Sequence, residues 1–249
     1  MGVSIFGSVV DQYDAARPSY PPELYAALGP LRGRYVLDAG TGTGIAAREL
    51  SARGARVIAL DLSREMLARA RVREPALAAV EADGAALPLL GASVDVACFA
   101  QSWHWMPEGQ RVREVARVLR AGGLWAAWWS HARADGTGWF DRQWQIFEGA
   151  CLGVHRSQRD VEWGRELAPS GLFAPAHSVS VLWTRRVDLV TWLTELRSHS
   201  YVAELGPARR EAVLGEVAEA MRADFAAGAV DVPYSTVLWK AERLEVPVP

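Results

Sequence analysis

The strand and helix pattern of this chain is anchored by Val36-Leu37-Asp38-Ala39-Gly40-Thr41-Gly42-Thr43-Gly44. An apolar run beginning at Tyr35 reaches an acid, and three alternating glycines then precede helix-forming sequence. This order predicts a buried parallel strand, a tight turn and the N-terminus of a helix. Alternate glycines allow positive φ and a close approach of backbone N–H groups to a ligand. The helix end adds unpaired donors and partial positive charge, so the loop suits an anionic or carboxylate-bearing ligand.

The composition indicates one soluble α/β domain with a sizeable core. The chain has 249 residues, half of them hydrophobic, and a formal net charge of -2, which argues against a nucleic-acid partner. The N-terminus lacks the pattern of a signal peptide, and no window is apolar for long enough to cross a membrane. Cys98 and Cys151 lie in apolar context and are expected to be buried free thiols. We expect a cytoplasmic monomer or homodimer.

The hydrophobic pattern alternates strands with helices up to Ser130. Strands are predicted at 35–38, 56–60, 78–82, 94–100 and 124–130, and helices at about 22–28, 45–53, 63–73 (capped by Ser63) and 110–119, the last ending at Gly122-Gly123. Later helices are predicted at 139–152, 161–167, 189–199 and 207–226, with strands at 177–187 and 234–243. This is the pattern of an α/β fold: a doubly wound, mostly parallel seven-stranded Rossmann-like sheet. The last strand is expected to be antiparallel, and a helical insertion or lid to follow strand five.

Acids end three successive predicted strands at Asp38, Asp61 and Asp83. All three should lie at the carboxyl edge of the sheet, where open α/β folds bind ligands. Asp61 is suited to accept hydrogen bonds from two ribose hydroxyls, and Asp83 from an adenine-like amine. Acids also cap such loops without binding anything, but three of them beside a glycine loop favour a nucleoside ligand. A dinucleotide would need glycine at the sixth position of its fingerprint, where this chain has Ile45, so NAD is disfavoured.

Two further stretches carry a family resemblance, Tyr13 to Pro21 (Tyr-Asp-Ala-Ala-Arg-Pro-Ser-Tyr-Pro) and Gln101-Ser102-Trp103-His104-Trp105. Together with the glycine loop, the strand-end acids and strand 94–100, they resemble class I S-adenosylmethionine-dependent methyltransferases. The chain is most similar to the methyltransferase type 11 group, in a bacterial branch related to trans-aconitate-type small-molecule enzymes. The resemblance implies a single methyltransferase domain over 1–249, with a cofactor-binding core at 6–130. Residues 131–232 would form the helical insertion and acceptor side, and 233–249 the last strand and tail.

The resemblance also implies roles for individual residues toward S-adenosyl-L-methionine. The methionine part would lie against the glycine loop and the backbone of Gln101, with the ribose on Asp61 and the adenine between Leu62, Met66 and the Asp83-Gly84 edge. The family usually has alanine where this chain has Gly84. Tyr13 and Arg17 would belong to a lid, although the segment 6–20 could equally pack on the sheet edge. The expected cofactor-binding residues are Tyr13, Arg17, Gly40, Thr41, Gly42, Asp61, Leu62, Met66, Asp83, Gly84 and Gln101.

Methyl transfer from a sulfonium mainly requires donor and acceptor to be held in line in a water-poor pocket. A base is needed only if the acceptor carries a proton of high pKa, and His104, just past strand four, is the candidate. His104 could instead order the loop or hydrogen-bond an acceptor. On strand five, Trp125 and Trp129 should share one face and Trp128 the other.

All 11 tryptophans lie at or after Trp103, which favours a small apolar or aromatic acceptor. The expected substrate-binding residues are Trp103, Trp105, His131, Trp139, His199 and Tyr201.

The sequence disfavours several other activities. Residues 101–104 lack the Asn/Asp-Pro-Pro-aromatic run of amino methyltransferases, and we expect no metal because no carboxylate cluster or zinc spacing is found. The prediction is methyl transfer to a small molecule, at oxygen first and otherwise at N, S or C. The alternative is a cofactor-binding enzyme of similar fold that catalyses a cyclisation or rearrangement. A carboxylate acceptor is left open by Arg156, Arg159, Arg165, Arg185, Arg186 and Arg197.

Overall fold

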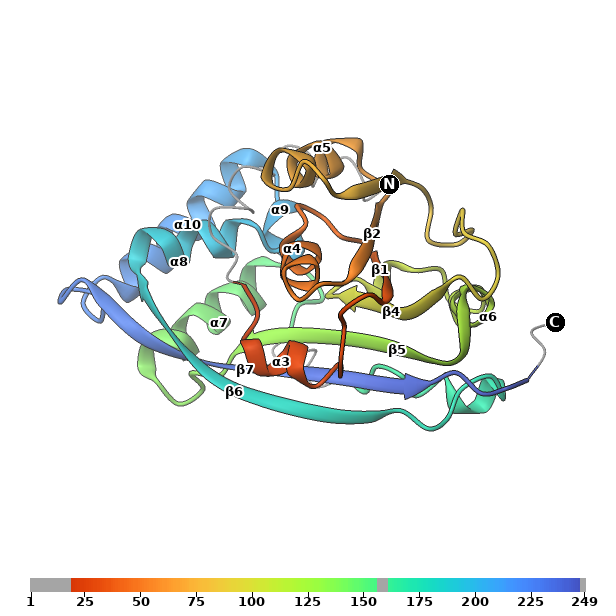
Figure 1. The fold of residues 1–249 in the computed structure, drawn as a ribbon. Coiled ribbons are helices and arrows are strands. Elements are labelled where there is room, and N and C mark those ends of the chain that lie inside the picture. Colours follow the sequence, from red (N-terminus) through yellow and green to blue (C-terminus); the bar gives the residue numbers. More distant parts are fainter. Residues whose placement is uncertain (1–18, 156–160, 247–249) are drawn as a thin grey trace. The chain divides into compact units, whose positions relative to one another are not determined.

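The computed structural model describes residues 19–155 and 161–246 (Figure 1). The chain divides into two compact units, each built from separate stretches. Among the described residues, the first unit comprises 19–130, 162–181 and 236–246, and the second comprises 131–155, Val161 and 182–235. The single domain expected over 1–249 stays a prediction. The segment 162–181, which the sequence assigned to the insertion, groups with the first unit.

The first unit carries the predicted parallel sheet. Its strands are β1 (Tyr35–Ala39), β2 (Arg56–Asp61), β3 (Ala78–Glu81), β4 (Val94–Ala100) and the longer β5 (Leu119–Ala132). Its helices are α3 (Pro22–Ala26), α4 (Ile45–Ala52), α5 (Arg64–Arg73) and α6 (Arg111–Val118). β1 pairs in parallel with β2 and β4, β2 with β3, and β4 with β5. With β6 (His177–Asp188) and β7 (Ala229–Glu242), the order is β3-β2-β1-β4-β5-β7-β6, which confirms the doubly wound seven-stranded fold.

The last strands run against the others. Gly122 N–H donates to Arg243 O at 2.9 Å, and Arg243 N–H donates to Gly123 O at 2.8 Å. Directly after the end of β5, Arg133 N–H donates to Pro233 O at 2.7 Å. Partner numbers on β7 therefore fall as those on β5 rise, which is the signature of an antiparallel pair. The long strands β5, β7 and β6 lie side by side in Figure 1.

Two predicted boundaries near Gly122-Gly123 are wrong: the end of the preceding helix and the start of strand five at residue 124. The helix does not reach Gly122-Gly123, because Leu119 already has extended backbone (φ -69°, ψ 141°) and begins β5. Gly122 has a φ of 71°, and the β4–β5 register shifts near Val94. The two glycines therefore produce an irregularity inside a strand rather than a helix end.

The later helices are α7 (Gly138–Ala150), α8 (Leu189–Arg197), α9 (Ser200–Ala203) and α10 (Pro207–Met221). The predicted helix at 161–167 is wrong: this segment forms turns followed by the 3-10 helix η3 (Ala168–Ser170). Gly164 has a φ of 127°, which no helix accommodates, and Pro169 follows. The Ser63 cap is confirmed, since its Oγ accepts the Met66 N–H at 3.3 Å.

Both faces of the sheet are covered in the first unit. One core cluster contains Leu37, Trp125 and Trp129, and the other contains Val36 and Trp128. This division confirms the predicted alternation of the three strand-five tryptophans. Cys98 and Cys151 are buried free thiols, as predicted.

The second unit has its own apolar cluster, into which a charged pair is built. Trp139, Phe140 and Trp192 pack edge to face within that cluster. Arg185 of β6 pairs with the buried Glu195 of α8 at 2.5 Å, and Tyr234 Oη donates to the same carboxylate at 3.1 Å. The pair connects β6, α8 and β7 within this unit.

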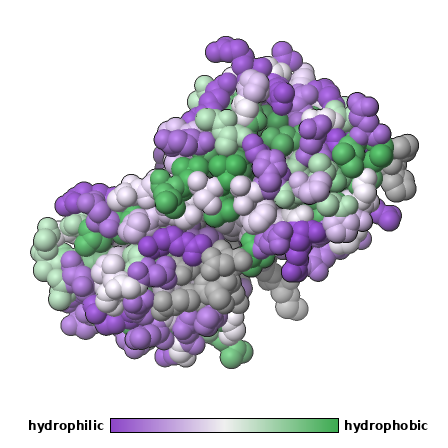
Figure 2. All heavy atoms as spheres, turned by 90° about the horizontal axis from the view of Figure 1, so that it is seen from below, coloured by the Kyte–Doolittle hydropathy of each residue, from purple (hydrophilic) through white to green (hydrophobic). Residues whose placement is uncertain are grey.

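Within residues 19–155 and 161–246, no helix is long and apolar enough to cross a membrane. The face drawn in Figure 2 mixes hydrophilic and hydrophobic residues.

Replacing Arg185 tests the buried pair. Arg185→Leu removes the cation that faces Glu195 and should lower the free energy of unfolding by about 2 kcal/mol, because a buried carboxylate loses its ion-pair partner. The neighbouring Arg186 pairs with Asp231 at 3.3 Å on the surface, so Arg186→Leu should change stability by less than about 0.5 kcal/mol. Urea unfolding followed by tryptophan fluorescence measures both variants. Equal stability of the two would contradict a stabilising role for the pair.

Candidate functional site

The glycine loop has the backbone that its sequence predicts. Gly40, Gly42 and Gly44 have φ values of 70°, 56° and 79°. The Gly40 and Thr41 N–H groups donate to Leu60 O at 2.8 and 2.9 Å, which ties the end of β1 to the end of β2. Gly44 caps α4, whose N-terminus therefore begins directly behind the loop.

Gly40 also allows the loops after β1 and β4 to meet. A Cβ on Gly40 would lie 2.5 Å from Ser102 Cβ, closer than any real contact. Ser102 Oγ donates to Ala39 O at 2.5 Å. The segment after β4 therefore lies directly against the glycine loop, at the point where the strand order reverses.

Asp38 is completely buried beside the loop. Its Oδ2 accepts the Thr41 hydroxyl at 2.6 Å, whereas no polar atom of the described residues lies within hydrogen-bonding geometry of Oδ1. Burial, with the Asp61 carboxylate as a smaller contribution, raises the pKa of Asp38 to about 6. Asp38 and Asp61 together make this edge of the sheet negative at neutral pH.

Asp61 connects the loop to the start of α5. Its Oδ2 accepts the Gly42 N–H at 2.8 Å and its Oδ1 accepts the Ser63 N–H at 2.9 Å. Burial raises the pKa of this carboxyl against the lowering effect of these hydrogen bonds. A carboxylate has about four lone-pair sites, so each oxygen can accept a further hydrogen bond from a ligand hydroxyl.

The residues expected around adenine divide into exposed and buried ones. Leu62 is 47% exposed, whereas Met66 is buried. Asp83 is exposed and its Oδ1 accepts the Ala85 N–H at 2.8 Å. A Cβ on Gly84 would lie 2.1 Å from Met106 Sδ. The end of the Met106 side chain therefore occupies the space beside Gly84.

Gln101 begins the turn after β4 in a strained conformation. Its φ of 57° is one of two positive values among the described non-glycine residues. Its N–H donates to Trp128 O at 2.9 Å, and its side-chain amide donates to Tyr20 Oη at 3.3 Å. Strained residues of this kind are concentrated at functional sites.

His104 lies in an aromatic group on η1 (Trp103–Trp105). Its ring centroid is 4.7 Å from that of Trp105 and 5.6 Å from that of Trp163, which stacks on Trp129 at 4.3 Å. Although part of His104 is exposed, these surroundings and the Arg111 guanidinium lower its pKa to about 4. The imidazole is neutral at pH 7, as a proton acceptor must be.

Trp103 does not have the expected place in an acceptor pocket. It is fully buried, packed against Phe99 and Trp125, and its indole N–H donates to Glu166 at 2.8 Å. This position gives Trp103 a core role. Trp105, by contrast, is 56% exposed.

The remaining expected substrate residues belong to the second unit. Trp139 is buried in that unit's cluster, so a core role also accounts for it. His199 Nδ1 and Tyr201 Oη are 2.7 Å apart, and His131 is partly buried on β5. Their sharing of one pocket with Trp105 stays a prediction. The expected lid residues Tyr13 and Arg17 lie outside the described residues.

Several arginines considered for an acceptor carboxylate have partners. Arg185 pairs with Glu195, Arg186 with Asp231 and Arg197 with Glu211. In the described part of the chain, no three His, Cys, Asp or Glu side chains gather in the way that a metal ion requires.

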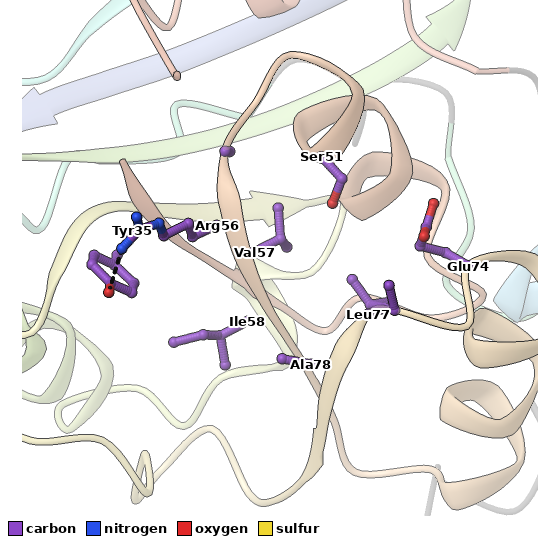
Figure 3. Close-up of a pocket in the computed structure, with 10 residues that line it drawn as sticks. Tyr35, Ser51, Arg56, Val57, Ile58, Glu74, Leu77 and Ala78 are labelled. Atoms are coloured by element: carbon purple, nitrogen blue, oxygen red, sulfur yellow. Dashed lines mark hydrogen bonds between the residues drawn. The ribbon is translucent and has the colours of Figure 1, made fainter. Parts of the chain in front are cut away.

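A pocket of about 320 Å³ lies at the opposite edge of the sheet (Figure 3). It is lined by Tyr35, Arg56 and Ala78, the first residues of β1, β2 and β3, and by Glu74 and Leu77. Arg56 donates to Tyr35 Oη at 2.8 Å there. Because the pocket opens at the amino ends of the strands, it is separate from the glycine loop.

Comparisons with known proteins agree with this geometry. Residues 37–127 match the family described as "Methyltransferase domain". An uncharacterized methyltransferase of Mycobacterium tuberculosis is 42% identical over 134 residues, covering 54% of this chain and 55% of the relative. A malonyl-acyl-carrier-protein O-methyltransferase of Pseudescherichia vulneris is 38% identical over 122 residues, covering 47% and 49%. The chain thus spans about half the length of these curated relatives.

A solved structure extends the similarity to nearly the whole chain. A putative type II methyltransferase from Anaeromyxobacter dehalogenans is 26% identical, with a TM-score of 0.68, and the match covers 91% of this chain and 97% of that one. Residues 37–127 therefore form a methyltransferase domain, within a fold of the class I S-adenosylmethionine-dependent kind. The trans-aconitate-type branch stays a prediction.

The sequence missed several residues that shape this methyltransferase site. Ser102 contacts the glycine loop, and Trp163 and Glu166 contact the turn after β4. A serine in a motif of tryptophans gave little signal. Trp163 and Glu166 were assigned to a helix in another region of the chain, so nothing local could place them beside β4.

Gly40 and Gly42 separate steric from conformational effects in the domain. Gly40→Ala places a methyl group into Ser102 and should cost about 3 kcal/mol of stability. Gly42→Ala, with nothing within 4 Å of the new Cβ, should cost only about 1 kcal/mol for its positive φ. Adding Ser102→Gly should partly restore the first variant and not the second. Thermal unfolding measures all four proteins, and equal losses for the two single glycine variants would disprove the contact.

The low pKa of His104 is open to a direct titration. In NMR spectra the His104 ring signals should titrate near pH 4, with His104→Gln used to assign them. Because the folded pKa lies below the unfolded value of about 6.5, acidification through this window should also lower stability, since the unfolded chain takes up the proton first. Trp163→Leu should raise the pKa toward 6.5. A wild-type midpoint near 6.5 would contradict the desolvated environment.

Proposed function

We propose that this protein transfers the methyl group of S-adenosyl-L-methionine to oxygen of a small apolar or aromatic molecule. The observation that carries this proposal is the contact between the glycine loop and the turn after β4, made through Gly40 and Ser102. It brings the cofactor loop and the aromatic group around His104 next to each other in one unit.

The residues at the carboxyl edge fit the proposed cofactor. Asp61 retains lone pairs for the ribose hydroxyls, the exposed Leu62 offers an apolar face to adenine, and exposed Asp83 can accept from the adenine amine. Asp38 Oδ1 is an acceptor within the described structure that a cationic amino group could satisfy, directly or through water. When bound, S-adenosylmethionine supplies a methyl group on a positively charged sulfur.

The residues of the turn after β4 would act on the acceptor. The neutral imidazole of His104 can take a proton from a hydroxyl as the methyl group is transferred. The rings of Trp105 and Trp129 beside His104 offer flat apolar surface that would help to hold donor and acceptor in line. The strained backbone of Gln101 fixes where this turn starts.

An oxygen acceptor is supported by one relative, whose printed name is an O-methyltransferase. The alternative of a cyclisation or rearrangement is not favoured, because the relatives are named as methyltransferases. The proposal also includes a small-molecule acceptor and a protein that is a monomer or a homodimer.

Calorimetric titration tests the cofactor. The protein should bind S-adenosylmethionine and give no heat with NADH. Asp61→Asn should weaken binding at least about tenfold, because it removes a charged acceptor of two hydrogen bonds. Glu81→Gln is the matched control, since Glu81 ends the next strand and makes a solvent-exposed pair with Arg64. Heat with NADH but none with S-adenosylmethionine would overturn the proposal.

The transfer itself is tested by mass spectrometry. A panel of phenols and aromatic alcohols should yield S-adenosylhomocysteine together with one methylated product. With that acceptor, His104→Ala should be about 100-fold slower, the usual size of a general-base contribution. Turnover of His104→Ala at the wild-type rate would reject the base role and leave the binding proposal intact.

A further inference from the structure

The segment 162–170 contacts the turn after β4 at two places. Trp163 stacks on Trp129, with ring planes 15° apart, and lies beside His104. Glu166, three residues later, accepts the indole N–H of Trp103 and the Arg111 guanidinium. All of these residues belong to the first unit. The activity proposed above gives neither Trp163 nor Glu166 a role.

We propose that Trp163 forms the acceptor-binding surface together with His104 and Trp105, that this surface takes a planar aromatic ring, and that Glu166 is its positioning residue. This inference rests on the proposed function, because the surface is assigned to the methyl acceptor.

Glu166 fixes the turn through one oxygen atom. Oε1 accepts from Trp103 Nε1 at 2.8 Å, from Arg111 Nε at 2.8 Å and from Arg111 Nη2 at 2.7 Å. The remaining terminal nitrogen, Arg111 Nη1, donates to the carbonyls of Trp103 and Met106 at 3.2 and 3.3 Å. Charge-assisted hydrogen bonds of this kind are stronger and more directional than neutral ones. The Glu166 carboxylate and the Arg111 guanidinium thus fix the start of η1 at Trp103 and the residue after its end, Met106.

The burial of Arg111 supports a positioning role. Its side chain is 7% exposed, and its Cζ lies 5.0 Å from the Trp103 ring centroid. Burying a guanidinium is costly unless a carboxylate neutralises it. Once Glu166 is in place, the turn carries no net charge from this pair.

The exposed rings indicate what the surface binds. Trp105 is 56% exposed and lies against His104, which in turn lies beside Trp163. Flat aromatic faces and a neutral imidazole favour stacking with another planar ring. Because Ser102 touches Gly40, a ring stacked here would lie beside the cofactor loop.

The test uses 2-naphthol as a planar probe and cyclohexanol as a non-aromatic comparison. In NMR spectra of the wild-type protein, 2-naphthol should shift the His104 ring and Trp105 indole signals, and cyclohexanol should not. Trp163→Leu should weaken 2-naphthol binding about fivefold, and Trp163→Phe should restore most of it. Glu166→Gln should also shift the Trp103 indole N–H signal and weaken the binding of 2-naphthol. The control is Glu162→Gln, since Glu162 is an exposed acid of the same segment, and it should match the wild type.

Calorimetry with S-adenosylmethionine separates this inference from the proposed function. All four variants should bind S-adenosylmethionine within about twofold of the wild type, because the altered residues are not part of the glycine loop. If the wild-type protein does not bind S-adenosylmethionine, the proposed function is refuted instead. This inference is overturned if 2-naphthol leaves both signals unmoved, or if Trp163→Leu and Glu166→Gln bind it as tightly as the wild type.

Discussion

The site depends on the missing side chain at Gly40. The loops after β1 and β4 can touch only because no Cβ stands between Gly40 and Ser102. The hydrogen bond from Ser102 Oγ to Ala39 O then fixes the contact. Gly40 belongs to the glycine loop, and Ser102 directly precedes the turn that carries His104. In the proposed methyl transfer, this contact would set the spacing between donor and acceptor, on which their alignment depends.

The glycine loop also lies beside buried carboxylates that are unfavourable for stability when they are charged. Two carboxylates, Asp38 and Asp61, are buried beside it, and burial raises the pKa of both. For Asp38 the folded pKa of about 6 exceeds the unfolded value of 3.8. The preference for the protonated folded form is therefore lost as pH rises from 3.8 through 6, and the charged group is destabilising at neutral pH. A chain that retains such a group at this edge gains negative charge where a cationic cofactor is proposed to bind.

The sequence was sufficient for the parallel half of the fold and for the backbone of the glycine loop. Alternating apolar runs, strand-end acids and the glycine loop are local signals, and each came out within a few residues of its prediction. The failures involve residues whose surroundings come from elsewhere in the chain. The helix expected at 161–167 is replaced by turns around Gly164, and Trp163 and Glu166 pack on residues 34 to 63 positions earlier along the chain, such as Trp129 and Trp103. No local pattern encodes such contacts.

The turn after β4 shows why a motif can be recognised while its geometry is misread. The sequence reading treated Trp103 and Trp105 as equivalent acceptor-side rings. In a 3-10 helix, however, residues three apart share a face. Trp103 and Met106 consequently point inward, where Glu166 holds the first and the missing Cβ of Gly84 admits the second. His104 and Trp105, between them, are left on the outer face. Two buried neighbours thus set the direction of the two exposed residues that we propose meet the acceptor.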